Sequence, residues 1–179
     1  FMAQTILMIL SYLVLKKIYP SKYEFRNQGH SFKYQFLIFF ILTSVTVIYG
    51  AFMAGMDAGK SFNTWPLMGD SFIPNSLIGD SGLHELYTNS VFIHFFHRIL
   101  AYLTCIFGVY IFVTSFRYIL SNFQKKHLII IEIIIFIQIL LGILTIIYEV
   151  PILLGALHQL SGSLLLMFTA TYTFSLFEK

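Results

Sequence analysis

The chain has 179 residues, of which 58% are hydrophobic and only 11% are charged, and its mean hydropathy is +0.81. Because soluble domains carry roughly 25% charged residues, this composition excludes a water-soluble globular protein, and its 20 Phe and 11 Tyr exclude a disordered one. The single cysteine, Cys105, excludes an intrachain disulfide and a cysteine-based metal site, and a net charge of +3 spread between apolar runs indicates no nucleic-acid partner.

The first apolar run, residues 1–15, is shorter than the roughly 20 residues that a helix needs to cross the hydrocarbon of a bilayer. It has no initiator methionine, basic leader or small-residue cleavage site, so it does not resemble a signal peptide. We interpret it as the truncated end of a preceding transmembrane helix, which predicts that the sequence is a fragment or a half of a longer protein. Residues 16–33 follow as a basic inner loop.

Four later segments are long and apolar enough to span the bilayer: residues 34–55, 89–115, 128–148 and 152–177. Short connections between the later spans favour antiparallel packing. The long connection 56–88 is rich in Gly, Asp, Asn, Pro and Ser, and we expect it to form a structured cap over one end of the bundle. The predicted fold class is therefore an all-α integral membrane protein, with an antiparallel four-helix transmembrane bundle over 34–179, a truncated preceding helix and a long outer-face loop.

Charges in the connections orient these helices. The connections 16–33 and 116–127 are basic, whereas 56–88 and 149–151 are acidic. The positive-inside rule places the basic connections on the cytoplasmic or matrix side, so the two acidic connections face the opposite, outer side. This pattern fits a bacterial cytoplasmic membrane and a mitochondrial inner membrane equally well.

Three histidines fall inside predicted spans, where ionisable side chains are rare and mark a function by default. At a rise of about 1.5 Å per residue, His97 and His158 both lie about 10 Å below the outer face. Two imidazoles at one depth on different helices suit the two axial positions of a haem iron. The alternative is that each histidine hydrogen-bonds a neighbouring helix. For His94, one turn before His97, the options are a partner of the ligands, an alternative ligand or a bundle hydrogen bond, and we favour the last.

A haem held by His97 and His158 also needs cations near its propionates and apolar walls around its ring. Arg98 or Lys60 could meet the propionates near the headgroups. The walls could come from large side chains next to the two histidines: Phe92, Phe95, Phe96, Leu157, Leu160 and Leu164.

Other polar and small residues favour structural roles. Glu132 lies near the inner end of its span, and we expect it to extend towards Lys125 or Lys126. His30 and His127 lie in the basic connections and are expected to be solvated. No phosphate-binding loop, nucleophile elbow or HExxH pattern supports a hydrolase or a kinase. Five residues are typical of helix–helix contacts: Gly50, Gly55, Gln138, Gly142 and Thr145.

Five stretches, in this order, carry a family resemblance: residues 49–59 (YGAFMAGMDAG), 62–70 (FNTWPLMGD), 96–102 (FHRILAY), 138–145 (QILLGILT) and 158–159 (HQ). Together they resemble the C-terminal half of heme A synthase, in the form found in mitochondria and related bacteria. The resemblance covers about residues 45–170, and the stretch in the long loop is its most specific part.

The resemblance implies an eight-helix membrane enzyme of two similar four-helix halves, which oxidises a methyl group of heme O to the formyl group of heme A for cytochrome oxidase. It implies that the C-terminal half binds haem b through His97 and His158, and that the heme O site and a catalytic glutamate lie in the other half. No catalytic residue is therefore assigned here, and the chain alone is expected to bind haem without turning over substrate. His94 stands where the family pattern has glutamine.

The expected partners are heme O, the lipid bilayer and, through the pathway, heme O synthase or cytochrome oxidase assembly factors. Two alternatives stay open: a non-enzymatic b-type cytochrome that only carries electrons, and an assembly protein that uses the bundle only to bind haem.

Overall fold

Four helices of 26 residues each dominate the structure, a computed structural model that describes residues 2–18, 30–77 and 84–177. At a rise of about 1.5 Å per residue each is about 39 Å long, enough to cross roughly 30 Å of hydrocarbon. All four are also apolar enough to do so. The predicted all-α membrane bundle is confirmed, and the described ranges contain no named strand. The helices are α2 (His30–Gly55), α4 (Ser90–Ser115), α5 (Asn122–Ile147) and α6 (Ile152–Phe177).

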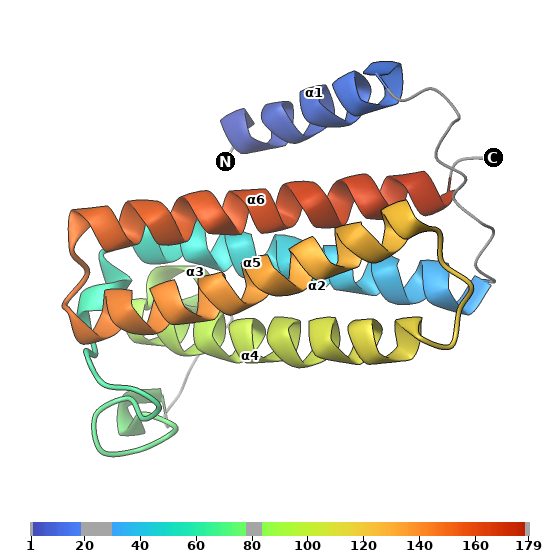
Figure 1. The fold of residues 1–179 in the computed structure, drawn as a ribbon. Coiled ribbons are helices and arrows are strands. Elements are labelled where there is room, and N and C mark those ends of the chain that lie inside the picture. Colours follow the sequence, from blue (N-terminus) through green and yellow to red (C-terminus); the bar gives the residue numbers. More distant parts are fainter. Residues whose placement is uncertain (1, 19–29, 78–83, 178–179) are drawn as a thin grey trace.

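The four long helices pack as the corners of a square. α2 packs along both α4 and α6, and α5 packs along α6 and more lightly along α4. α4 and α6 therefore occupy diagonal corners. A further helix, α1 (Met2–Ile18), packs on the outer side of α6 (Figure 1). Most of the expected basic loop between α1 and α2 lies outside the described residues, at 19–29.

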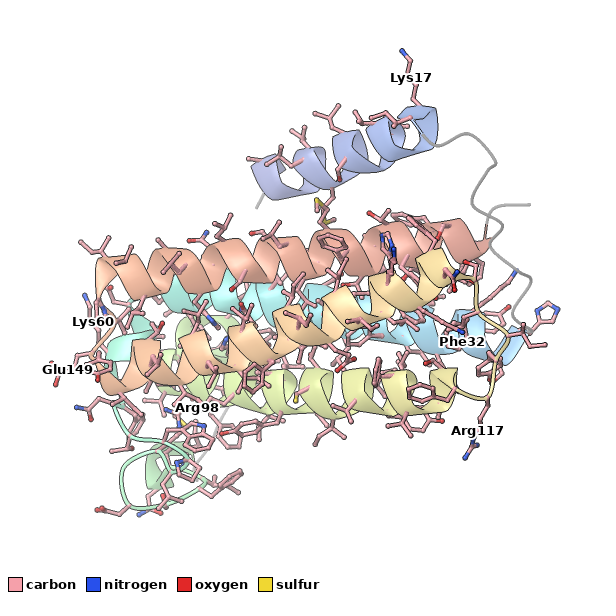
Figure 2. All side chains as sticks on the ribbon, in the orientation of Figure 1. Lys17, Phe32, Lys60, Arg98, Arg117 and Glu149 are labelled. Atoms are coloured by element: carbon pink, nitrogen blue, oxygen red, sulfur yellow. The ribbon has the colours of Figure 1, made fainter. Side chains whose placement is uncertain are left out.

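The two ends of the bundle carry different connections and charges. One end, called here the loop end, carries the long connection between α2 and α4 together with the tight α5–α6 turn. Lys60 and Glu149 mark this end in Figure 2, and Lys17 and Arg117 mark the other, called here the Arg117 end. In the α5–α6 turn, Glu149 and Val150 have positive φ angles of 59° and 60°, which reverse the chain just before Pro151.

α5 begins at Asn122, whereas hydropathy predicts a span from residue 128. The reason is a capping box at its start. The Ser121 hydroxyl accepts from the Gln124 N–H at 3.2 Å, and the Ser121 N–H donates to Gln124 Oε1 at 2.8 Å. Because these bonds satisfy backbone groups at the helix start, the helix extends beyond the apolar span, and the connection from α4 shortens to 116–121.

Aromatic packing fills the Arg117-end half of the bundle. Phe32, Phe36 and Phe39 of α2 are buried. The ring of Phe36 lies 4.4 Å from that of Tyr172 on α6, and the ring of Phe32 lies 4.7 Å from that of Tyr118 after α4. Offset aromatic pairs at these separations add to the stability that their burial provides. The apolar core therefore lies mainly away from the loop end.

Most hydroxyls in the spans are satisfied within their own helices. Thr43, for example, donates to the Phe39 carbonyl at 2.8 Å, four residues back. Other hydroxyls bond across helices, such as those of Thr46 and Thr104, which lie 2.9 Å apart. A helix in lipid must satisfy its polar groups internally, and these bonds do so. The same four-residue pattern recurs at Ser44, Thr46, Thr114, Thr145, Thr169, Thr171 and Thr173.

The long loop only partly forms the expected cap. Its first turn, η1 (Ala58–Lys60), is packed against α2 and α4, and a side chain at Gly59 would come within 3.1 Å of Val150 in the α5–α6 turn. Asn63 also donates to Glu149 at 3.2 Å. Residues 61–77, with η2 (Asn75–Leu77), lie beside the first turns of α4 (Figure 1), and α3 (Glu85–Thr88) leads into that helix.

Candidate functional site

The imidazoles of His97 and His158 face each other inside the loop-end half of the bundle. Their ring centres are 6.4 Å apart and their planes are nearly perpendicular, at 86°. His97 comes from α4 and His158 from α6, the two diagonal helices. Counted at about 1.5 Å per residue from each helix start, both lie about 10 Å below the loop end. The structure thus brings together the two residues that the sequence analysis paired by depth.

This spacing suits two ligands of one metal ion. An imidazole nitrogen lies about 2.0 Å from a metal that it binds and about 1.15 Å from its own ring centre, so two imidazoles on opposite sides of one ion would have centres about 6.3 Å apart. The separation of 6.4 Å between His97 and His158 agrees with that value. Histidine is a usual axial ligand of haem iron, so the donor set fits a bis-histidine haem. The described residues contain no cluster of three or more His, Cys, Asp or Glu that could hold a metal by themselves.

Contacts with α2 hold the His97 ring in place. Its Nδ1 lies 3.2 Å from the Thr46 carbonyl, and a proton on Nδ1 would make this a hydrogen bond and leave Nε2 as the ligating nitrogen. A Cβ at Gly50, one turn further along α2, would lie 3.3 Å from Cε1 of the His97 ring. The glycine therefore provides the space that the imidazole occupies.

His158 is contacted by α5, at the ring nitrogen opposite to the one contacted in His97. A Cβ at Gly142 would lie 2.9 Å from Cε1 of the His158 ring, closer than real contacts allow. The Gln138 amide nitrogen makes a long contact of 3.5 Å to Nε2 of the ring, and its carbonyl oxygen accepts from the Ser161 hydroxyl. The ring's Nδ1 is buried and makes no hydrogen bond within the described residues. The expectation that Gln138 and Gly142 serve only helix contacts is therefore too narrow, because both touch this imidazole.

Arg98 joins the long loop to α4. Its Nε donates to His94 Nε2 at 3.1 Å, and its two terminal nitrogens donate to the carbonyls of Leu67 and Thr64 at 3.1 and 2.8 Å. The His94 ring is fully buried, and the hydrogen bond at its Nε2 comes from the same helix and not from a neighbouring helix. We expected Arg98 or Lys60 to meet the haem propionates. The Arg98 guanidinium instead donates to carbonyls of the loop, and Lys60 forms an ion pair with Asp57 at 2.9 Å.

The expected walls divide between the two helices. On α4, Phe92 and Phe96 stack with ring centres 5.5 Å apart and are half-buried. On α6, the face that carries His158 continues through buried Ser161, Gly162 and Leu165, at the spacing of one helix face. The three leucines expected as walls lie on the other side of α6 and are exposed, so they do not face His97: Leu157, Leu160 and Leu164.

Two further expectations near the Arg117 end are corrected. His127 lies within α5 rather than in a solvated connection, and its ring packs on those of Phe123 and Phe168 at 4.2 and 5.7 Å. Glu132 is half-buried, and no ion pair joins it to Lys125 or another described lysine. Neither residue lies near the paired imidazoles, since both are more than two turns of α5 away from Gly142.

The four membrane-length apolar helices identify an integral membrane protein. The sequence matches the family described as "Cytochrome oxidase assembly protein" over residues 1–170. The chain belongs to this family, which is the heme A synthase family that the sequence motifs indicate.

Individual relatives agree with this assignment. The heme A synthase of Pelagibacter ubique is 38% identical over 134 residues, which cover 74% of this chain and 39% of that protein. The heme A synthase of Flavobacterium psychrophilum is 41% identical over 138 residues, covering 74% and 40%. That of Rickettsia prowazekii is 37% identical over 142 residues, covering 73% and 40%. The chain thus spans about two fifths of the length of these relatives.

Proposed function

We propose that this chain forms the haem b-binding part of a heme A synthase, with His97 and His158 as the two axial ligands. The observation that carries the proposal is the pair of facing imidazoles, 6.4 Å apart, at one depth on diagonal helices. The family membership and the names of the relatives support the pathway, heme A biosynthesis in cytochrome oxidase assembly.

The reaction proposed for the whole enzyme is oxidation of a methyl group of heme O to the formyl group of heme A. When bound, haem b supplies a centre that can accept and pass on single electrons. Residues of this chain would hold that centre. The Thr46 carbonyl and Gly50 orient His97, and Gly142 and Gln138 orient His158. We assign no catalytic residue in this chain, and we propose that heme O binds in the part of the enzyme outside it.

The partners follow from the same proposal. Heme O is the substrate, the lipid bilayer is the solvent of the four long helices, and a heme O synthase or cytochrome oxidase assembly factors would precede or follow the enzyme in the pathway. We also propose that the Arg117 end faces the matrix or cytoplasm. Exposed Arg117, Lys125 and Lys126 lie at that end, whereas Asp57 and Glu149 lie at the loop end.

The test is the reduced-minus-oxidised absorption spectrum of the detergent-purified chain and its variants. We expect a low-spin b-type signal in the unmodified chain. His97→Ala and His158→Ala should each abolish this signal or convert it to a high-spin one, because each removes one axial ligand. His84→Ala is the matched control, since His84 is exposed in the loop and should leave the spectrum unchanged.

Two outcomes would overturn the ligand assignment. One is a folded, helical chain that takes up no haem when haem is supplied. The other is a low-spin signal that survives in both histidine variants. A third outcome would favour the alternative function, an electron-carrying cytochrome. It is a normal b-type spectrum without any conversion of heme O when the chain is tested as part of the whole protein.

A further inference from the structure

Four large apolar side chains of the long loop are exposed beside α4 rather than buried against the bundle. They are Trp65, Leu67, Phe72 and Ile73, with 43%, 40%, 50% and 52% of their surfaces exposed, and together they are called here the loop patch. The part of the loop that carries this patch lies beside the first turns of α4, on the side of the bundle away from α1 (Figure 1). The patch therefore projects sideways from the bundle.

Arg98 fixes how deep the patch lies. Arg98 is about 12 Å along α4 from its start, and a helix of about 39 Å centred on roughly 30 Å of hydrocarbon puts this position inside the hydrocarbon boundary. Side chains on a helix tilt towards its N-terminus, so the guanidinium reaches back towards the boundary. There it binds the carbonyls of Thr64 and Leu67, on either side of Trp65. The patch is thus held at the level where headgroups meet acyl chains.

The backbone of residues 64–71 suits the boundary between headgroups and acyl chains, because an irregular backbone near hydrocarbon must satisfy its polar groups internally. The Thr64 hydroxyl donates to the Leu67 carbonyl at 2.9 Å and accepts from the Gly69 N–H at 2.8 Å. The Met68 N–H donates to the Ser71 carbonyl at 2.9 Å. With the two bonds from Arg98, the turn satisfies many of its own polar groups and turns its apolar side chains outward.

We propose that the loop patch inserts into the boundary between headgroups and acyl chains of the leaflet at the loop end. Tryptophan is typical of that boundary. The connection 56–88 carries Asp57, Asp70, Asp80 and Glu85 against Lys60 alone, so apolar burial and not attraction to anionic lipid drives the insertion. The proposal does not depend on haem binding.

Trp65 is the single tryptophan of the chain and is therefore a built-in reporter. The chain is reconstituted in phosphatidylcholine vesicles, with unlabelled lipid or with lipid brominated near the top or near the end of its acyl chains. We expect bromines near the top to quench Trp65 most, those near the chain end to quench it less, and aqueous iodide to quench it weakly. Dividing each intensity by that in unlabelled lipid cancels any energy transfer to haem.

A variant with Phe72→Asn and Ile73→Asn tests the patch itself. It should reduce quenching of Trp65 by bromolipid and increase quenching by iodide. The matched control, Phe116→Asn with Ile119→Asn, alters the same residue types, also exposed, at the Arg117 end and should change neither. The proposal is overturned if bromolipid fails to quench Trp65 in the unmodified chain while iodide quenches it strongly, or if neither does because a second copy covers the patch.

Discussion

Each imidazole of the site packs against a glycine on a neighbouring helix. The virtual Cβ of Gly50 lies 3.3 Å from the His97 ring, and that of Gly142 lies 2.9 Å from the His158 ring. Neither glycine has a positive φ, so the backbone does not require it. Glycine is required at both positions because the imidazole ring occupies the space of a side chain, so a side chain at either position would move the histidine.

Gly142→Ala should therefore reduce haem binding strongly, and Gly50→Ala should reduce it less because its contact is longer. Alanine favours a helix over glycine by about 1 kcal/mol, so a loss cannot come from weakening the helix. The measurement is haem bound per chain together with the low-spin band. Gly155→Ala is the control, since a Cβ there meets nothing within 4 Å. Equal haem content in all three variants would show that the glycines do not shape the site.

Residue type and depth were enough to select His97 and His158 from the sequence. Their supports could not be selected in this way. The Thr46 carbonyl belongs to the backbone, which no side-chain pattern marks, and the bonds from Arg98 to the loop depend on tertiary packing. The spacing of Gln138 and Gly142, one helical turn apart, was visible but equally consistent with plain helix packing.

At the scale of helices, α4 packs against α5 at a glycine. A Cβ at Gly108 would lie 2.6 Å from Cδ1 of Ile135 and 3.4 Å from the Phe39 ring. Small residues let membrane helices approach closely, and here the end of one isoleucine side chain fills the space. This contact belongs to the apolar half of the bundle, away from the histidines.

Gly108→Ala should lower the midpoint of thermal unfolding in detergent, because Ile135 must move. Ile135→Val removes the crowded Cδ1 and by itself costs about 0.5–1.5 kcal/mol. In the double variant the methyl added at residue 108 fills the space left by Cδ1, so the loss should be smaller than the sum of the single losses. Gly55→Ala, with open space around it, serves as the reference for the helix effect. Strictly additive losses would mean that the two residues do not share this space.

Hydropathy located the four long helices well and their polar ends poorly. The predicted spans from 34 and 128 begin later than α2 at His30 and α5 at Asn122. A hydropathy pattern records the part of a helix that lies in hydrocarbon, whereas hydrogen bonding continues the helix into the headgroups. The Ser121-x-x-Gln124 pattern of the capping box is present in the sequence. The basic residues that follow it lower the hydropathy there, so a hydropathy pattern does not include this turn in the span.

For the whole molecule, the separation of charge between the two ends predicts an orientation. In a chain whose only native cysteine is removed by Cys105→Ser, Glu149→Cys should react with a membrane-impermeant maleimide added outside intact cells. Arg117→Cys should react only after the membrane is permeabilised, because the proposed orientation places the basic end on the inner side of the membrane. The opposite labelling pattern would contradict the proposed orientation. It would not affect the description of the bundle or of the histidine site.

The two imidazoles belong to different hairpins of the chain. The α2–α4 pair contains His97 with Thr46 and Gly50, and the α5–α6 pair contains His158 with Gly142. As the chain inserts into the membrane, each hairpin can complete its own half of the site, but neither holds both rings. The proposed bis-histidine centre could therefore form only after the hairpins have docked, so haem capture would follow docking and would then hold the two hairpins together.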